Sequence, residues 1–183
     1  MIDLRELGTI TSGYGKRTSP TTGASTNHKG LDIVLTDKNI PSVTSGTVSY
    51  VGYSNSAGNY IKIKQNDGTT ATYMHMASPS SLSVGDKVSE GQTVGIMGNT
   101  GISTGTHLHI QFEDDNGTVL DPVAYFETGD GTNTNWYLES DDTGGVSGVV
   151  LGFVGKIIYF VAILLVIILA VYLFMKAFDI QII

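Results

Sequence analysis

The stretch Thr106-His107-Leu108-His109-Ile110-Gln111-Phe112 alternates apolar or β-branched residues with polar ones, which predicts a β-strand. Residues two apart on a strand point to the same face, so His107 and His109 should project side by side, with Leu108 directed into a core. Two neighbouring imidazoles suit a metal site, and the alternative is a pair of surface histidines. The chain has four histidines, and the surroundings of the other two decide between these interpretations.

The composition of the 183-residue chain limits the classes of protein to consider. A formal net charge of -7 argues against a nucleic-acid binder that relies on phosphate contacts. The 23 glycines and the low share of charged residues, 15%, indicate a turn-rich β protein rather than a helical one. Because the chain has no cysteine, disulfides, thiolate catalysis and cysteine-bound zinc are excluded.

Short strands separated by glycine-rich turns fill the first 127 residues, which we interpret as one domain. Residues 1–12 are expected to be a lead-in and residues 39–41 a turn, and no segment before residue 149 has a convincing helical period. This pattern predicts a mainly β fold built on an antiparallel sheet. Besides the opening stretch, the predicted strands are residues 42–53, 59–65, 69–76 and 93–97, with hairpin turns at 66–68 and 114–117.

The C-terminal part of the chain has a different composition. Residues 128–148 are rich in Gly, Thr, Ser, Asn and Asp, which predicts a flexible acidic linker. From Ile157 to Met175 every residue is apolar or aromatic, and about 19 helical residues span roughly 30 Å, the thickness of a bilayer core. A single transmembrane α-helix is therefore predicted over residues 149–176, followed by a short tail at 177–183.

The sequence His28-Lys29-Gly30-Leu31-Asp32 places another histidine near a carboxylate. Gly30 disfavours a helix and the following Ile33-Val34 favours a strand, so a loop histidine and a strand carboxylate can converge here. Two imidazole nitrogens and one carboxylate oxygen form a recognised catalytic zinc set, with a fourth position left for water. Zinc activates that water, and the reaction then needs a base and a donor to the oxyanion. Two histidines remain once the ligands are assigned.

The order of these motifs resembles that of the LytM/lysostaphin-type zinc endopeptidases, which cut peptide bonds in bacterial cell walls. The resemblance runs from about Thr11 to Phe126 and includes many motifs in the same order. These motifs are Ser12-Gly13-Tyr14-Gly15-x-Arg17, His28-x-Gly30-x-Asp32, Gly46-x-Val48, Tyr73-x-His75, Val84-Gly85-Asp86-x-Val88-x-x-Gly91-Gln92, Gly98-x-Thr100-Gly101, His107-x-His109 and Asp121-Pro122.

The resemblance implies a role for each candidate site residue. It implies His28, Asp32 and His109 as the ligands of one Zn²⁺ per chain. It also implies His75 and His107 as the catalytic pair, one acting as the base and the other stabilising the oxyanion, with the assignment between them left open.

A tyrosine just before the first zinc histidine assists some lysostaphin-like enzymes. Residues 18–27 contain no tyrosine here. The role is therefore either absent or taken by Tyr14, Tyr60 or Tyr73.

Other polar residues of the motifs are expected to have structural roles. Arg17 is predicted to brace a loop through an ion pair rather than to contact the substrate. Asp114 and Asp115 are predicted turn residues. Asn99 and Thr100 are predicted to shape the loop before the strand at residues 106–112.

Together these features predict a membrane-anchored zinc endopeptidase that hydrolyses the peptide cross-links of peptidoglycan. Residues 157–175 would contact the lipid bilayer, and no nucleic acid is expected as a partner. The alternative is a non-catalytic module of the same fold that binds the wall or activates another wall hydrolase.

The cellular location is predicted from the ends of the chain. Residues 1–6 have neither the basic nor the apolar region of a signal peptide, and the apolar span follows the catalytic domain. The domain is expected to face the cell wall, either from the membrane of a phage virion, with other virion proteins as partners, or from a bacterial cell envelope.

Overall fold

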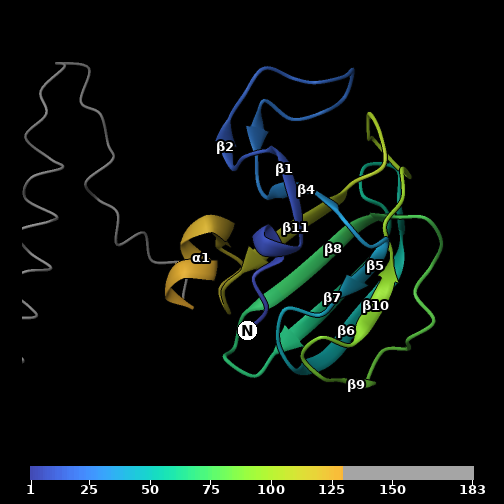
Figure 1. Cartoon of the computed structure of the whole chain (residues 1–183), viewed down its shortest axis with the longest axis vertical. Coiled ribbons are helices and arrows are strands. Elements are labelled where there is room, and N and C mark those ends of the chain that lie inside the picture. The colour runs from blue at the N-terminus through green and yellow to red at the C-terminus, as the bar shows by residue number, and fades with distance from the viewer. Residues whose placement is uncertain (130–183) are drawn as a thin grey trace, which may run out of the picture. The chain divides into compact units, whose positions relative to one another are not determined.

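The computed structural model describes residues 1–129, which form an antiparallel β structure (Figure 1). The main sheet follows the order β1-β4-β11-β8-β7-β6-β9, and β12 pairs with β11 beside that path. This confirms the predicted mainly β fold. The strands of this sheet are β1 (Gly8–Ser12), β4 (Leu31–Leu35), β6 (Gly46–Ser54), β7 (Gly58–Gln65), β8 (Thr70–Met76), β9 (Lys87–Val88), β11 (Leu108–Glu113) and β12 (Val119–Leu120).

Two small sheets complete the β structure. One pairs β5 (Asn39–Pro41) with β10 (Thr93–Ile96), and the other pairs β2 (Gly15–Lys16) with β3 (Asn27–His28). The loop between β2 and β3 and the loop that precedes β11 both rise at the upper end of the molecule in Figure 1. These two loops therefore lie where they can enclose a site at one end of the main sheet.

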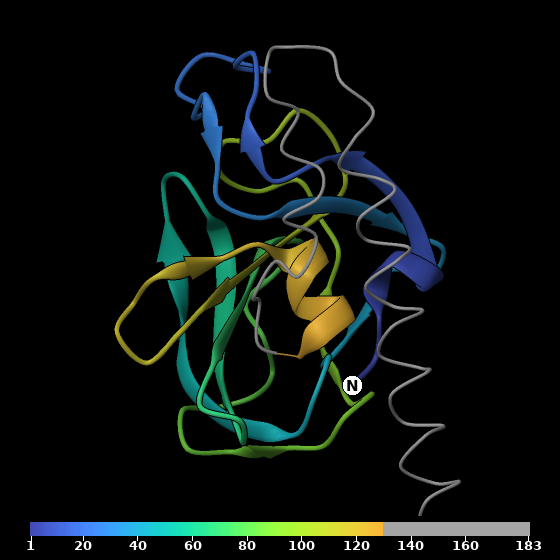
Figure 2. The same cartoon turned by 90° about the vertical axis from the view of Figure 1, so that its left-hand side faces the viewer.

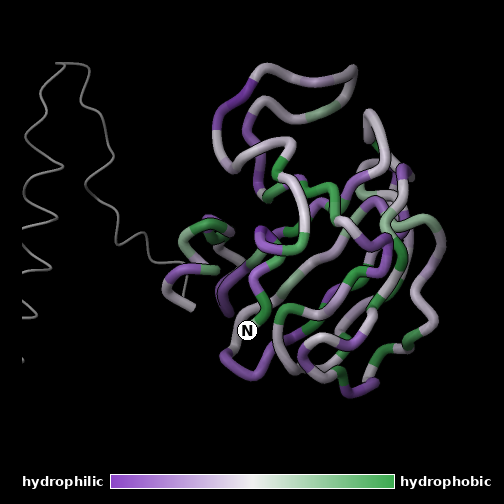
Figure 3. Tube along the Cα trace, viewed as in Figure 1, coloured by the Kyte–Doolittle hydropathy of each residue, from purple (hydrophilic) through white to green (hydrophobic). Residues whose placement is uncertain are grey.

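The core lies on one face of the main sheet, as strict alternation along its central strands requires. On β11, Leu108, Ile110 and Phe112 are fully buried, while the residues between them face the other way. The predicted direction of Leu108 is thus confirmed. In Figure 3 the hydrophobic residues gather along the strands, whereas the turn between β7 and β8 is hydrophilic.

Two short helices precede residue 149, in a region where the sequence shows no convincing helical period. These are the 3-10 helix η1 (Leu4–Leu7) and the α-helix α1 (Pro122–Thr128). The helix α1 begins after Asp121, whose side chain accepts from the backbone N–H of Val123 at 2.8 Å, and ends before Gly129, which has φ 81°. A helix of about two turns is too short to show the 3.6-residue period of apolar residues. The capping residues are therefore the only sequence signal for α1.

The helix α1 forms because it can pack on the sheet. The ring of Tyr125 stacks on Phe112 of β11 with ring centroids 4.1 Å apart, and Figure 2 shows the helix against the strands. A helix of this length is marginal without tertiary packing. Its last residue, Thr128, had been predicted as the start of the linker.

Two further elements differ from the predictions. The lead-in contains β1, which pairs with β4 in a register that places Thr9 opposite Val34. The expected turn at residues 39–41 is β5, which pairs with β10. Both strands are short and partly exposed. They form because they pair with β4 and β10, and their own residues carry little strand signal.

The predicted hairpin turns at residues 66–68 and 114–117 are confirmed, since they join β7 to β8 and β11 to β12. The predicted membrane helix, the tail and the linker beyond residue 129 lie outside the described residues. Within residues 1–129, no helix has the length and apolar character needed to cross a bilayer.

Candidate metal centre and catalytic cleft

Three elements bring the predicted metal ligands together at one end of the main sheet. Asp32 of β4 and His109 of β11 are directly opposite each other in the pairing of these strands. His28 lies at the end of β3, held there by the pairing of β3 with β2. All three side chains are largely buried, at 3% exposed for His28, 8% for Asp32 and 9% for His109.

One atom of each side chain faces a common point. The Nε2 atom of His28 lies 3.1 Å from Oδ1 of Asp32 and 3.0 Å from Nδ1 of His109, and Nδ1 of His109 lies 2.9 Å from Oδ1 of Asp32. Ligands about 2.1 Å from a tetrahedral Zn²⁺ would be about 3.4 Å apart, so small outward shifts accommodate the ion. The residues fit zinc in number, type and spacing.

Neighbouring groups fix the orientation of each ligand. The Nδ1 atom of His28 lies 2.6 Å from the carbonyl oxygen of Gly13, so donation there leaves Nε2 for the metal. A side chain on Gly30 would collide with the ring of His109, since its Cβ would lie 2.6 Å from Cε1. The glycine of the His-x-Gly-x-Asp sequence therefore provides the space that the His109 ring occupies.

The electrostatics of the centre favour an ionised Asp32 beside an uncharged His109. Burial opposes the charge on Asp32, but hydrogen bonds from His107, His109 and His28 outweigh it and hold the pKa of Asp32 far below its ordinary value. Burial lowers the pKa of His109, against the attraction of Asp32. Zinc requires this pattern of charge, because its ligands must be deprotonated.

The remaining two histidines lie beside the three ligands. The ring centroids of His75 and His107 are 4.9 Å apart, and His75 and His109 are 5.9 Å apart. Each of the two rings has its Nδ1 atom 2.8 Å from a backbone carbonyl oxygen, that of Thr100 for His75 and that of Gly105 for His107. Donation from Nδ1 to these carbonyls leaves Nε2 of His75 for a substrate or water, and directs Nε2 of His107 to within 3.5 Å of Oδ1 of Asp32.

The two imidazoles differ in their titration. Burial lowers the pKa of His75 to about 4, against the stabilising carbonyl of Thr100. Burial also disfavours the charged form of His107, but Asp32 and the carbonyl of Gly105 outweigh it and raise the pKa of His107. The His107 Nε2 atom lies 3.5 Å from Oδ1 of Asp32, which accounts for the contrast.

A β-bulge directs His75 into the site. On β8, Tyr73 is fully buried in the core, so regular alternation would also direct His75 toward the core. The register between β7 and β8 shifts at this point, and His75 is the one non-glycine residue with positive φ, 62°, among those described. Bulges of this kind commonly redirect a side chain beside an active site.

The five residues border an open cleft of about 390 Å³ together with a small adjoining hollow of about 40 Å³. The cleft is floored by outward-facing residues of β8 and β11, among them Met74 and Gln111, and walled by residues of the β2–β3 loop and by Ile102. An open cleft of this kind can receive an extended chain. Polar groups line it at the end where the histidines lie.

None of the three candidate tyrosines lines this cleft or the hollow. Tyr73 belongs to the core, where its hydroxyl accepts from the backbone N–H of Val43 at 3.0 Å and burial raises its pKa to about 12. Tyr60 lies on β7, and Tyr14 is 40% exposed near the start of the β2–β3 hairpin.

The predicted structural roles agree with the observed contacts. Arg17 donates from Nη1 to Asp32, so its ion pair braces the loop against a metal ligand. The hydroxyl of Thr100 donates to the carbonyl of Met76 at 2.7 Å and accepts from the N–H of Asn59. Asp114 accepts from the backbone N–H groups of Asn116 and Thr118, as a turn residue does.

Sequence reasoning missed the backbone acceptors of the site. The carbonyls of Gly13, Thr100 and Gly105 fix the orientation of three histidine rings. A backbone carbonyl leaves no trace in the residue type. The glycine-rich motifs around these positions were the only indication that the chain passes close to the site.

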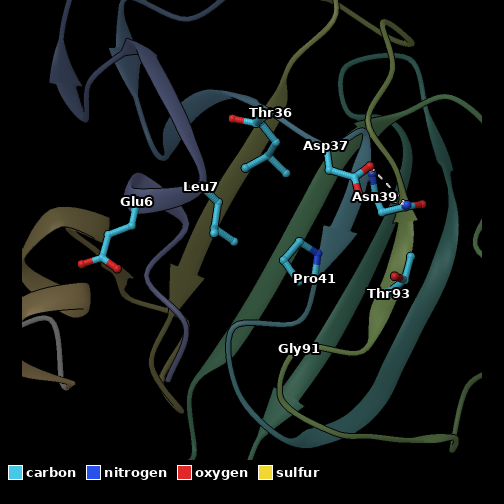
Figure 4. Close-up of a pocket in the computed structure, with 9 residues that line it drawn as sticks. Glu6, Leu7, Thr36, Asp37, Asn39, Pro41, Gly91 and Thr93 are labelled. Carbon is cyan, nitrogen blue, oxygen red and sulfur yellow. Dashed lines mark hydrogen bonds between the residues drawn. The ribbon is translucent and has the colours of Figure 1, made fainter.

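A second hollow, of about 440 Å³, lies between η1 and the strands β4, β5 and β10 (Figure 4). Its lining includes Glu6 and Asp37, but no histidine. The carboxylate of Asp37 accepts from the backbone and side-chain nitrogens of Asn39. The chemistry of the described residues therefore lies at the histidine cleft, although that cleft is the smaller of the two.

A β-sheet carrying a buried His-Asp-His set beside two further histidines defines a zinc metallopeptidase centre. Residues 26–122, more than half of the chain, match Peptidase family M23, and the chain belongs to this family. This confirms the resemblance to the LytM/lysostaphin-type enzymes, and the His28, Asp32 and His109 site is typical of zinc binding in the family.

Three known proteins illustrate the similarity. The chain is 33% identical over 135 residues to glycyl-glycine endopeptidase ALE-1 of Staphylococcus capitis, covering 70% of this chain and 37% of ALE-1. It is 34% identical over 98 residues to peptidoglycan DD-endopeptidase ShyC of Vibrio cholerae, covering 53% of this chain and 22% of ShyC. The solved catalytic domain of lysostaphin from Staphylococcus simulans superposes with a TM-score of 0.61 at 31% identity, covering 69% of this chain and 98% of that domain.

The matches cover only part of the curated relatives. The chain spans 37% of ALE-1 and 22% of ShyC, so the similarity extends over well under half of each of these proteins.

Proposed function

We propose that this chain is a zinc-dependent endopeptidase that hydrolyses the peptide cross-links of bacterial peptidoglycan. The observation that carries the proposal is the convergence of five side chains at one open cleft. Three of them direct a ligand atom to a common point, and the other two lie beside it with Nδ1 held by backbone carbonyls. The names of ALE-1 and ShyC, both endopeptidases, support the same class of reaction.

The protein supplies positioning and proton transfer. Zinc, when bound by His28, Asp32 and His109, supplies Lewis-acid polarisation of the scissile carbonyl and a more acidic water. His75 and His107 are held by backbone carbonyls, so their rings are already oriented before a substrate arrives. One, as the neutral ring, accepts the proton of the attacking water at Nε2 and delivers it to the leaving amine, while the other, protonated at both nitrogens, donates a hydrogen bond from Nε2 to the developing oxyanion.

Metal analysis of purified variants tests this proposal most directly. The wild type should hold about one zinc per chain, and chelator or His28→Ala should remove it together with activity. His109→Ala should lose zinc and activity, whereas His107→Ala and His75→Ala should lose activity but keep most of the zinc. A folded wild-type protein that does not bind zinc would contradict the proposal.

Defined muropeptides with glycine or D-alanyl cross-links should then identify the bond, because the names of ALE-1 and ShyC point to different linkages. Product masses give the position of cleavage. A zinc-loaded protein that cleaves none of these substrates would instead support the non-catalytic wall-binding module.

We also propose that residues 157–175 attach the domain to a lipid bilayer, facing the cell wall. The uninterrupted apolar composition of this segment supports the proposal. Leu165→Arg, which places a charge in the middle of the segment, should shift the full chain from the membrane fraction to the soluble fraction. An unchanged distribution would count against the anchor.

Carriage of the enzyme by a phage particle stays a prediction, and mass spectrometry of purified virions tests it. Detection in a host membrane fraction and absence from particles would favour the bacterial envelope instead.

A further inference from the structure

The face of the sheet that carries the metal centre continues past it as a row of neighbouring residues on successive strands. His109 of β11 lies opposite Asp32 on one side and opposite Met74 of β8 on the other. On the next strand, β7, Tyr60 lies at the bulge between the paired residues Asn59 and Ile61, and so beside Met74 of β8. On its other side, Tyr60 lies opposite Gly52 of β6. Strands are about 4.8 Å apart, so Tyr60 lies about 10 Å from His109 and β6 about 14 Å from it.

These residues all point away from the core. Ile61 on β7 and Tyr73 on β8 are fully buried, so Tyr60 and Met74, their chain neighbours, face the opposite side. Met74 lines the open cleft beside the histidines. The surface from the metal centre to β6 is therefore one continuous face.

The row ends on a pair of stacked tyrosines. The rings of Tyr50 and Tyr60 have centroids 5.0 Å apart and an interplanar angle of 22°. The Tyr50 ring lies over Gly52, since a Cβ there would be 2.6 Å from the Tyr50 hydroxyl and 2.8 Å from Cζ. Gly52 thus leaves the room in which the two rings stack. Tyr50 remains 41% exposed, so the pair presents aromatic surface to solvent.

The charge around this pair indicates a neutral ligand. Lys62, opposite Tyr50 on β7, is the nearest cation along the sheet, and its Nζ atom is held 3.2 Å from Oε2 of Glu113. Two phenol rings offer apolar faces to C–H groups and hydroxyls to polar groups at the rim. A saccharide ring combines one apolar face with hydroxyl groups, and it matches this surface better than a charged group does.

The spacing agrees with a substrate that joins a peptide to a sugar. An extended peptide advances about 3.3–3.6 Å per residue, so the distance from the metal centre to the tyrosines corresponds to about three to four residues. Wall peptides are attached to glycan strands through short stems of this scale.

We propose that the Tyr50–Tyr60 pair binds a sugar ring of the glycan strand that carries the peptide under cleavage. The proposal rests on the proposed function and adds a specificity determinant to it. It makes the enzyme prefer glycan-attached peptides over free ones.

Two matched substrates test the proposal: a cross-linked peptide without sugar, and the same peptide attached to its disaccharide. Tyr50→Ser and Tyr60→Ser should each raise KM about three- to tenfold for the glycan-attached substrate, while leaving kcat/KM for the free peptide within about twofold. Tyr53→Ser is the matched control, because Tyr53 is 60% exposed on the same strand but alternates to the other face from Gly52. Equal losses on both substrates, or no loss on either, would overturn the proposal.

Binding without catalysis separates this proposal from the proposed function. Glycan strands stripped of peptide should bind the full-length wild type and the His75→Ala variant in a co-sedimentation assay. The Tyr50→Ser/Tyr60→Ser double variant should bind less glycan. Its circular dichroism spectrum should match that of the wild type, which shows that the variant is folded. Glycan binding by a wild type that cleaves no wall substrate would remove the proposed function but keep the tyrosine site. Equal retention of wild type and double variant would remove the tyrosine site alone.

Discussion

Arg17 donates from Nη1 to Oδ2 of Asp32 at 3.1 Å, while the other carboxylate oxygen, Oδ1, faces His28 and His109. The same Nη1 atom donates to the hydroxyl of Ser12 at 2.6 Å. The guanidinium thus holds Oδ2 of Asp32 in a structural contact, and Oδ1 is left to face the metal site. Because Arg17 is the first residue of the β2–β3 loop, it also connects that loop to the metal centre.

Replacing Arg17 should therefore weaken metal binding without removing a ligand. Arg17→Gln is expected to reduce zinc affinity about 10- to 100-fold, the usual effect of losing a group that orients a ligand. Competition with a chromogenic chelator measures the affinity. Lys16→Gln, at an exposed neighbouring position, is the control and should bind zinc like the wild type. Equal affinity in Arg17→Gln would show that Asp32 needs no such support.

Gly30→Ala should disturb the metal centre from outside the ligand set. The new Cβ would lie 2.6 Å from Cε1 of His109 and 2.5 Å from the carbonyl oxygen of Ile110. Overpacking of this kind costs about 1–3 kcal/mol, so both zinc content and Tm should fall. Gly105→Ala is the matched control, since nothing lies within 4 Å of a Cβ at that glycine. Full zinc content and an unchanged Tm in Gly30→Ala would contradict the predicted collision.

The backbone of His75 predicts an unusual order of stabilities. Its φ of 62° is unfavourable for residues with a side chain, so His75→Gly should be more stable than His75→Ala by about 1 kcal/mol. At Met74, on the same strand, the order should be reversed, because glycine weakens an ordinary strand. Urea unfolding of the four variants measures the free energies. The usual order at both positions would rule out strain at His75.

Asp67 should give the domain an acid-sensitive contribution to stability, away from the metal centre. Partial burial opposes its charge, but hydrogen bonds from Tyr125 and Thr69 outweigh this and lower the pKa of Asp67 below 3.8. A carboxyl whose pKa is lower in the folded state stabilises the fold above its unfolded pKa. That contribution is lost as the pH falls through the folded value.

Asp67→Asn is therefore expected to lower the free energy of unfolding by about 1 kcal/mol at pH 7, allowing for solvent screening. The difference from wild type should shrink toward zero below the pKa of the folded carboxyl. Unfolding by urea at a series of pH values measures this difference, with Glu6→Gln as a control at a second exposed carboxylate. A difference that does not vary with pH would point to packing rather than charge.

The sequence by itself determined the sheet class and the residue types of the site. Alternation in residues 106–112 predicted that Leu108 enters the core, and the structure shows it fully buried. The turn sequences at 66–68 and 114–117 located two hairpins. These features are local, because the alternation of a strand and the conformation of a turn depend on residues within a few positions of each other.

Only the tertiary structure decided which side chains meet. Alternation from Tyr73 directs His75 into the core, and the bulge that directs it to the cleft depends on a register shift against β7. The helix α1 is defined by its packing on Phe112. Two of the carbonyls that orient histidine rings, those of Gly13 and Thr100, come from loops distant in sequence from His28 and His75. Each of these features depends on contacts between strands and loops far apart in the chain, which residue type and spacing do not encode.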